Sequence, residues 1–245
     1  MSGRLRLLPR SIEEAYARGD RAGSFDAAGL FADISGFTTM TEALMRHGKV
    51  GAEALASVLA SVFDPLVDAI HAHGGEVVSF AGDAFTAVFA SDAAGSGTGR
   101  ALAAAMEVRD RMARSPDRQT PYGPFSFAIR MGLAAGGASW RIYEGAGGRH
   151  AYAFRGRAIE ECAAAEHHAG IGDLVIPATL RERIATPMDV ERIGDGSFLR
   201  VTGAELRDVA DPVPAHPAPT GWLRPMPSSL PRWLTRAHAG SSAGS

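Results

Sequence analysis

Apolar residues in the first third of the chain form one short run and then a long helical pattern. Residues 27–34 are apolar except for Asp33, and the turn-forming pair Ser35-Gly36 follows. A short apolar run that ends at a turn predicts a buried strand. From residue 41 to residue 73, apolar residues recur at three- and four-residue steps, which predicts a helix. Asp64-Pro65 lies inside this pattern and predicts a kink or a restart.

Two further apolar runs, residues 76–80 and 85–90, are separated by four residues, which is a spacing typical of a β-hairpin. The remaining pattern predicts helices at residues 11–18, 100–113, 158–168 and 179–184, and strands at 125–135, 139–143, 150–154, 173–176 and 197–201. The order βααβ, then βα and more strands, predicts an α+β fold: a ferredoxin-like βααβ core whose mostly antiparallel sheet carries its helices on one face.

Composition divides the chain into three parts. Residues 1–24 are charged and form an N-terminal extension, residues 25–203 form the domain, and residues 204–245 are a proline-rich linker or tail. The net charge of −2 gives no general attraction to nucleic acid. We find no signal peptide and no run of about 20 apolar residues that would span a membrane. The single cysteine, Cys162, permits no internal disulfide. We therefore expect a cytoplasmic protein with no membrane span.

Two aspartates have apolar or very small neighbours: Asp33 near the end of the first strand and Asp83 at the hairpin tip. A buried carboxylate is costly unless it is paired or binds a metal. If the first strand lies beside the hairpin, both acids reach the same end of the sheet, where Mg²⁺ would remove their repulsion. The turn at Ser35-Gly36 exposes backbone N–H groups ahead of a helix, as in phosphate-binding sites.

Each aspartate alone has a simpler explanation, as a cap or as a turn former. An aspartate at a strand end is also found in haloacid-dehalogenase-like phosphatases, but the second aspartate expected two residues later is Ser35 here. The pair, in its two sequence contexts, is much more specific than either residue.

Residues 31–42, FADISGFTTMTE, and residues 74–85, GGEVVSFAGDAF, resemble class III adenylate and guanylate cyclases. The resemblance continues through residues 129–136, IRMGLAAG, and 156–159, GRAI, and covers about residues 25–202. The domain is most similar to the first cyclase domain of bicarbonate-responsive soluble adenylyl cyclases.

The resemblance implies one half of a catalytic site that forms between two such domains. Asp33 and Asp83 would be catalytic carboxylates that bind two Mg²⁺ ions, with Mn²⁺ as an alternative, and the Ile34 carbonyl would be a third metal ligand. Arg130 would contact the triphosphate of ATP, with GTP as the other candidate substrate. Backbone N–H groups of four residues would bind the β- and γ-phosphates: Ser35, Gly36, Phe37 and Thr38.

The sequence departs from the family on the other half of the site. The base-reading lysine position is Ser79 and the base-reading aspartate position is Ala153. The transition-state asparagine position is Glu160, and the position of its arginine partner is Ala164. A homodimer would repeat this deficient surface in both sites. We therefore expect an isolated homodimer to be inactive, and we expect a complementary cyclase domain in the same longer chain or in another chain.

Two other functions compete with an adenylate cyclase half-domain in intracellular signalling. One is a catalytically inactive regulatory domain that binds nucleotide or a partner domain. The other is a diguanylate cyclase, which should carry a GGDEF-type hairpin, whereas residues 81–85 read AGDAF.

Overall fold

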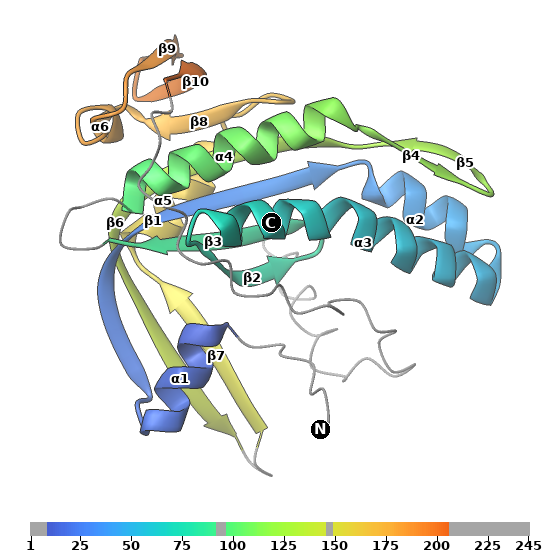
Figure 1. The fold of residues 1–245 in the computed structure, drawn as a ribbon, viewed down its shortest axis with the longest axis horizontal. Helices are drawn as coiled ribbons and strands as arrows, with labels where there is room; N and C mark the ends of the chain where they lie inside the picture. The colour runs from blue at the N-terminus through green and yellow to red at the C-terminus, as the bar shows by residue number, and fades with distance from the viewer. Residues whose placement is uncertain (1–8, 92–96, 146–148, 206–245) are drawn as a thin grey trace, which may run out of the picture.

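The computed structural model describes residues 9–91, 97–145 and 149–205 (Figure 1). Most of the predicted tail, from residue 206 onward, and the first eight residues of the predicted N-terminal extension lie outside this part of the chain. The fold is built on two long central strands, β1 (Ala22–Ser35) and β6 (Ala128–Gly145), which pair antiparallel from Ala22 opposite Arg141 to Ser35 opposite Ala128.

The main sheet has eight strands in the order β2-β3-β1-β6-β8-β10-β9, and β7 also pairs with β6. All its pairs are antiparallel except β6 with β8. The outer strands are β2 (Glu76–Ala81), β3 (Ala84–Ala90), β7 (Arg149–Arg155), β8 (Leu174–Pro177), β9 (Met188–Ile193) and β10 (Phe198–Ala204). A separate hairpin joins β4 (Asp117–Thr120) to β5 (Gly123–Ser126). The predicted α+β class with a mostly antiparallel sheet is confirmed.

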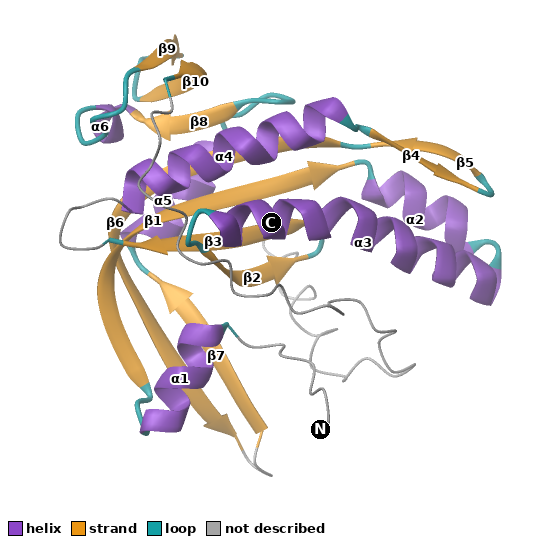
Figure 2. Cartoon of the chain, viewed as in Figure 1, coloured by secondary structure: helices purple, strands orange, loops and turns teal. Residues whose placement is uncertain are grey.

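Three helices cover one face of this sheet: α2 (Phe37–Met45), α3 (Gly48–Ala72) and α4 (Gly97–Arg114) (Figure 2). Their apolar residues share one core with Leu30 of β1 and with Met131 and Leu133 of β6. The element order β1-α2-α3-β2-β3-α4 matches the predicted βααβ core.

Helix α5 (Arg157–Glu166) is the exception to the predicted arrangement of helices on one face. A Cβ built on Gly132 would lie 2.0 Å from the Cys162 carbonyl oxygen of α5, whereas the neighbouring Met131 and Leu133 point into the core under α3 and α4. Because side chains alternate between the two faces of a strand, α5 packs on the opposite face. The short helix α6 (Ala178–Arg181) follows β8.

The predicted break at Pro65 does not end the helix, because α3 continues from Gly48 through Pro65 to Ala72. Proline has no N–H, so the carbonyl four residues earlier, that of Ser61, loses its partner within the helix. The Arg118 guanidinium replaces this donor and lies 3.2 Å from the Ser61 carbonyl oxygen. The β4–β5 hairpin therefore supports the helix at its proline.

Within the described residues, α3 is also the one helix that is long and apolar enough to cross a membrane. Its inner side packs in the domain core through Val58, Val62, Leu66 and Ile70. The absence of a membrane span stays a prediction, and the packing of α3 gives this apolar helix a role inside the domain.

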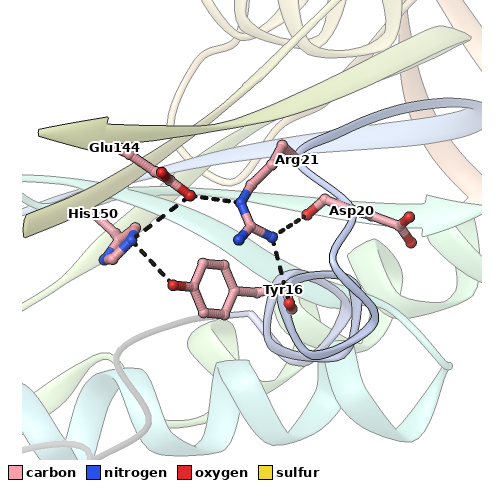
Figure 3. Close-up of polar contacts among 5 residues, drawn as sticks. All are labelled: Tyr16, Asp20, Arg21, Glu144 and His150. Atoms are coloured by element: carbon pink, nitrogen blue, oxygen red, sulfur yellow. Dashed lines mark hydrogen bonds and ion pairs between the residues drawn. The ribbon is translucent and has the colours of Figure 1, made fainter. Parts of the chain in front are cut away.

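Helix α1 (Arg10–Arg18) belongs to the predicted N-terminal extension and packs beside the β6–β7 hairpin (Figure 3). The Tyr16 hydroxyl lies 3.1 Å from His150 Nε2, and the Arg21 guanidinium lies over the Tyr16 ring at 4.2 Å from its centroid. Arg21 Nε also donates to Glu144 at 2.7 Å. These contacts join the start of the described chain to a hairpin more than 120 residues later.

Candidate functional site

The predicted metal-binding residues lie where β1, the β2–β3 hairpin and the beginning of β6 meet. Asp33 stands opposite Ala84 of β3 on one side and opposite Arg130 of β6 on the other. The Ile34 N–H donates to the carbonyl oxygen of Asp83 at 3.2 Å. The two aspartates, fifty positions apart in sequence, are thus brought to one end of the sheet.

Side chains alternate between the two faces of β1, and this alternation determines which face Asp33 occupies. Ala32 and Ile34 are fully buried in the core beneath the helices, so Asp33 points to the opposite face, where its side chain is 19% exposed. The Arg130 guanidinium, on the paired strand, donates to the Asp33 carboxylate through Nη2. The carboxylate is therefore held by a cationic group.

A two-residue turn, Gly82-Asp83, places the second aspartate. Gly82 has φ +67° at the first turn position, where a type II′ hairpin has glycine, and Ala81 pairs with Ala84 across the turn. The pKa of Arg130 is raised, chiefly by its hydrogen bond to Asp33 and also by the charges of Asp33, Glu166 and Asp83. One guanidinium thus lies in the field of three carboxylates.

The predicted phosphate-binding turn also has the expected backbone. Gly36 has φ +110°, and α2 begins at Phe37 with no side-chain cap. The first N–H groups of a helix have no partner within the helix, so they are available to an anion. The Phe37 ring stacks on the Phe63 ring, with the centroids 5.4 Å apart, and its centroid lies 4.7 Å from that of Phe127. These contacts anchor the start of the helix in the core.

Ser35 and Thr38 complete this segment. The Ser35 hydroxyl donates to the Ala128 carbonyl oxygen at 3.3 Å, so its side chain is tied to β6, whereas Thr38 is exposed. The predicted phosphate contacts use only the backbone N–H groups of these residues. The side-chain hydrogen bond of Ser35 therefore does not interfere with them.

Glu166 is a residue of this site that the sequence analysis did not identify. It is 5% exposed, and its Oε1 lies 3.4 Å from Arg130 Nε. Burial raises the pKa of Glu166, an effect that the Arg130 charge opposes and the Asp33 charge reinforces. A sequence signal did exist: Ala158, Cys162 and Glu166 recur every four residues and form the buried side of α5.

The four positions that depart from the family lie on the surface of the domain or near it. Ser79 is exposed on β2 beside a register shift between Val77 and Ser79. Ala153, on β7, pairs with Arg141 of β6 and is half-buried. Glu160 and Ala164 are exposed on α5, away from its buried side. None of the four forms a hydrogen bond or an ion pair with Arg130 or Asp33 in the ranges that the structure describes.

The residues present fit a divalent cation, because a cationic group already pairs with Asp33. The Arg130 guanidinium is a stand-in cation on this carboxylate, and the Asp83 charge also acts on it. No group of three His, Cys, Asp or Glu side chains gathers as a metal site in residues 9–91, 97–145 and 149–205. The predicted set has two carboxylates and one backbone carbonyl, which suits an ion that keeps water and phosphate oxygens as further ligands.

Comparison with known proteins supports the resemblance seen in the sequence. No protein-family model matches the chain. The chain is 25% identical over 182 residues to adenylate cyclase type 10 of Oryctolagus cuniculus, which covers 72% of this chain and 11% of that protein. It is likewise 25% identical over 180 residues to adenylate cyclase type 10 of Homo sapiens, covering 72% and 11%. The chain thus spans about a ninth of the length of these curated relatives.

Solved structures show the same fold. The guanylate cyclase domain of RhGC from Catenaria anguillulae, in complex with GTP, superposes with a TM-score of 0.60 at 18% identity, covering 75% of this chain and 100% of that one. The adenylyl cyclase CyaB from P. aeruginosa superposes with a TM-score of 0.55 at 22% identity, covering 75% and 97%. The predicted resemblance and the predicted fold are both confirmed.

Proposed function

We propose that this chain, a domain with the class III nucleotidyl cyclase fold, is the metal- and triphosphate-binding half of a cyclase site that converts ATP to cyclic AMP and pyrophosphate. The observation that carries the proposal is the meeting of Asp33 and Asp83 at one end of the sheet, where the Ile34 N–H donates to the Asp83 carbonyl oxygen at 3.2 Å. Nothing in the packing of the core requires two carboxylates at this place.

Each part of the site has a task in this reaction. The Asp33 and Asp83 carboxylates and the Ile34 carbonyl would hold two Mg²⁺ ions, with Mn²⁺ as an alternative, and these ions would supply charge neutralisation when bound. The N–H groups of Ser35 to Thr38 bind the β- and γ-phosphates, and Arg130 orients the triphosphate.

In the reaction, the ribose 3′-oxygen forms a bond to the α-phosphorus while the bond from the α-phosphorus to the β-phosphate oxygen breaks. Pyrophosphate leaves, and the 3′-hydroxyl proton passes to solvent. Asp33 and Asp83 are the catalytic residues, and they act by holding positive charge beside the reacting phosphate. Positioning of the triphosphate supplies the rest of the rate acceleration.

A complementary cyclase domain, in the same longer chain or in another, supplies the second half of the site. It would provide the groups that Ser79, Ala153, Glu160 and Ala164 lack. An acid in place of an amide cannot donate to a developing phosphate charge, and alanine cannot replace an arginine donor. Base choice would also belong to the partner, so GTP is the alternative substrate. The setting would be cytoplasmic signalling.

The same four positions favour a second candidate, a catalytically inactive regulatory domain that binds nucleotide or a partner domain. The two candidates differ in turnover. Mixing the chain with a cyclase domain that carries Lys, Asp, Asn and Arg at the complementary positions should give cyclic nucleotide if the first is right, and none if the second is right. Under either candidate function, the chain alone should give no cyclic nucleotide.

Binding provides the direct test of the site. Isothermal titration of the chain with Mn²⁺ and a non-hydrolysable ATP analogue should show binding that Asp33→Asn and Asp83→Asn each remove. Asp26→Asn, at an exposed position on the same strand as Asp33, is the matched control and should bind as the parent chain does. Undiminished binding by both site variants would refute the metal site.

A further inference from the structure

Arg130 is shared between two carboxylates that come from different elements of the fold. Its Nη2 donates to Asp33 on β1, and its Nε faces Glu166 at the end of α5. Arg130 itself lies on β6, which pairs with β1 and packs against α5. The guanidinium thus bridges a proposed metal ligand and a buried acid that has no role in the proposed reaction so far.

The contact with Glu166 is incomplete. The distance from Arg130 Nε to Glu166 Oε1 is 3.4 Å, beyond the usual hydrogen-bond range of about 2.7–3.2 Å. Within the described chain, both atoms are buried and have no hydrogen-bond partner. A buried donor and a buried acceptor left unpaired are both costly, yet here they face each other. A small reorientation of the guanidinium that aligns Nε–H on the oxygen would join them.

The backbone of β6 holds Glu166 at this place. Gly132 lies two residues beyond Arg130 on the same face of the strand, and a Cβ there would lie 2.4 Å from the Glu166 backbone nitrogen. The glycine lets α5 approach the sheet closely, which brings the acid within reach of Arg130. Glu166 is 5% exposed as a result, so solvent cannot take the place of its partner.

We propose that Glu166 is a positioning residue that receives the Arg130 guanidinium when a divalent cation takes the Asp33 carboxylate. This inference rests on the proposed function. In the state described here, Arg130 neutralises Asp33 and competes with any cation for it. An arriving divalent cation repels the guanidinium, and Glu166 offers the displaced group a second anion without loss of its position beside the triphosphate site.

Removal of the Glu166 charge should therefore weaken cation binding. In Glu166→Gln, the displaced guanidinium has only an amide oxygen to pair with, so Arg130 stays on Asp33 and the Mn²⁺ affinity of the full chain falls about tenfold, the scale of one charge-assisted hydrogen bond. Electron paramagnetic resonance of free Mn²⁺, measured without nucleotide, gives this affinity. Glu161→Gln is the matched control, because Glu161 is on the same helix and pairs only with Arg157 in the described contacts.

A double variant shows whether Glu166 acts through Arg130. Arg130→Gln removes the competitor for Asp33, so Arg130→Gln/Glu166→Gln should bind Mn²⁺ at least as tightly as the parent chain. If the double variant stays as weak as Glu166→Gln, Glu166 does not act through Arg130 and the inference is wrong. The Arg130 Nε–H resonance gives an independent readout: Mg²⁺ should shift it downfield in the parent chain, and not in Glu166→Gln, as its hydrogen bond to Glu166 forms.

The outcomes separate this inference from the proposed function. If Asp33→Asn loses Mn²⁺ while Glu166→Gln binds it normally, Glu166 has no positioning role and the proposed metal site stands. If Asp33→Asn binds Mn²⁺ normally, the inference is wrong, and if Asp83→Asn also binds it normally, the proposed site is wrong as well. If Glu166→Gln does not fold, Glu166→Asp retains the charge but moves it away by one methylene, and a partial loss of Mn²⁺ affinity is expected; an unchanged affinity overturns the inference.

Discussion

The Ile34 N–H donates to the Asp83 carbonyl oxygen at 3.2 Å, which ties the tip of the β2–β3 hairpin to the end of β1. This bond extends the β1–β3 ladder, whose last register pair is Asp33 with Ala84. The spacing of the two aspartates is thus set by backbone pairing. The backbone of a site fixed in this way would need little reorganisation to bind cations, which favours catalysis by positioning.

The packing of α5 on β6 depends on Gly132. A Cβ at this position would lie 2.0 Å from the Cys162 carbonyl oxygen, so Gly132→Ala must push α5 away from the sheet. We expect a loss of about 3 kcal/mol in the free energy of unfolding. Urea denaturation measures it.

Gly137→Ala is the matched control for this variant. Gly137 lies on the same strand, and a Cβ there meets no atom within 4 Å. Because alanine loses less conformational entropy than glycine, Gly137→Ala should stabilise the domain by about 0.5 kcal/mol. Equal losses in the two variants would show that α5 does not need this close approach.

Gly36 should be needed for triphosphate binding. It has φ +110°, and a Cβ there would lie 2.4 Å from the Ser126 carbonyl oxygen, so Gly36→Ala must distort the turn that leads into α2. We expect the affinity for a non-hydrolysable ATP analogue to fall by at least about tenfold, since the N–H groups would no longer converge. Isothermal titration in the presence of Mg²⁺ measures the change.

Gly123→Ala separates backbone strain from damage to the site. Gly123 has nearly the same φ, +113°, but open space around its Cβ position, and it lies in the β4–β5 hairpin. The Gly123→Ala variant should lose stability through backbone strain alone and keep the nucleotide affinity of the parent chain. If Gly36→Ala binds nucleotide as tightly as Gly123→Ala does, the turn at Ser35-Gly36 does not bind the phosphates.

The central part of the fold could be predicted from the sequence because its signals are local. The apolar run before Ser35-Gly36 and the hairpin around Asp83 have short-range signatures, and the helical crossover between them returns the chain to the same end of the sheet. The predicted strand at residues 27–34 is nonetheless shorter than β1, which begins at Ala22. Residues 22–26 are less apolar, and their pairing with β6 is a long-range contact.

Other features depended on contacts that local patterns reveal weakly. Residues 125–135 and 139–143 were predicted as two strands, but β6 runs through Gly136 and Gly137 in register with β1. The β4–β5 hairpin and β9 were not predicted: β4 is wholly polar, β5 contains Gly123 and Pro124, and β9 mixes three apolar with three charged residues. Glu166 was missed because a glutamate at the end of a helix resembles a surface residue, although its four-residue spacing from Cys162 places it on the buried side of α5.

Arg21 should hold α1 against the β6–β7 hairpin. Its guanidinium contacts the Tyr16 ring and carbonyl oxygen, and it pairs with Glu144, whose pKa it lowers (Figure 3). Arg21→Ala should speed amide hydrogen exchange in α1 and in the hairpin, with a small decrease in Tm because the ion pair is exposed.

Arg18→Ala is the matched substitution for Arg21→Ala. Arg18 pairs with Asp20 at 3.1 Å near the end of the same helix, without reaching the hairpin in the described contacts. Exchange in the hairpin should therefore stay at its parent rate in Arg18→Ala. Faster hairpin exchange in both variants, or in neither, would show that Arg21 does not join the two elements.

The stability of the domain should rise with pH through the range just below 6.5 because of His71. Burial near the end of α3 lowers the pKa of His71, and the charges of Glu76 and Asp68 only partly oppose this. In this range the unfolded chain binds a proton at His71 and the folded chain does not, so the free energy of unfolding increases as the unfolded chain loses this proton, by at most about 1.4 kcal/mol per pH unit.

Urea denaturation between pH 5 and 8 should show the rise in the parent chain and a flatter profile in His71→Gln. Above about pH 7.5 the imidazole is neutral in both states, so the two profiles should run parallel there. Parallel profiles over the whole range would mean that burial of His71 does not affect stability through its proton.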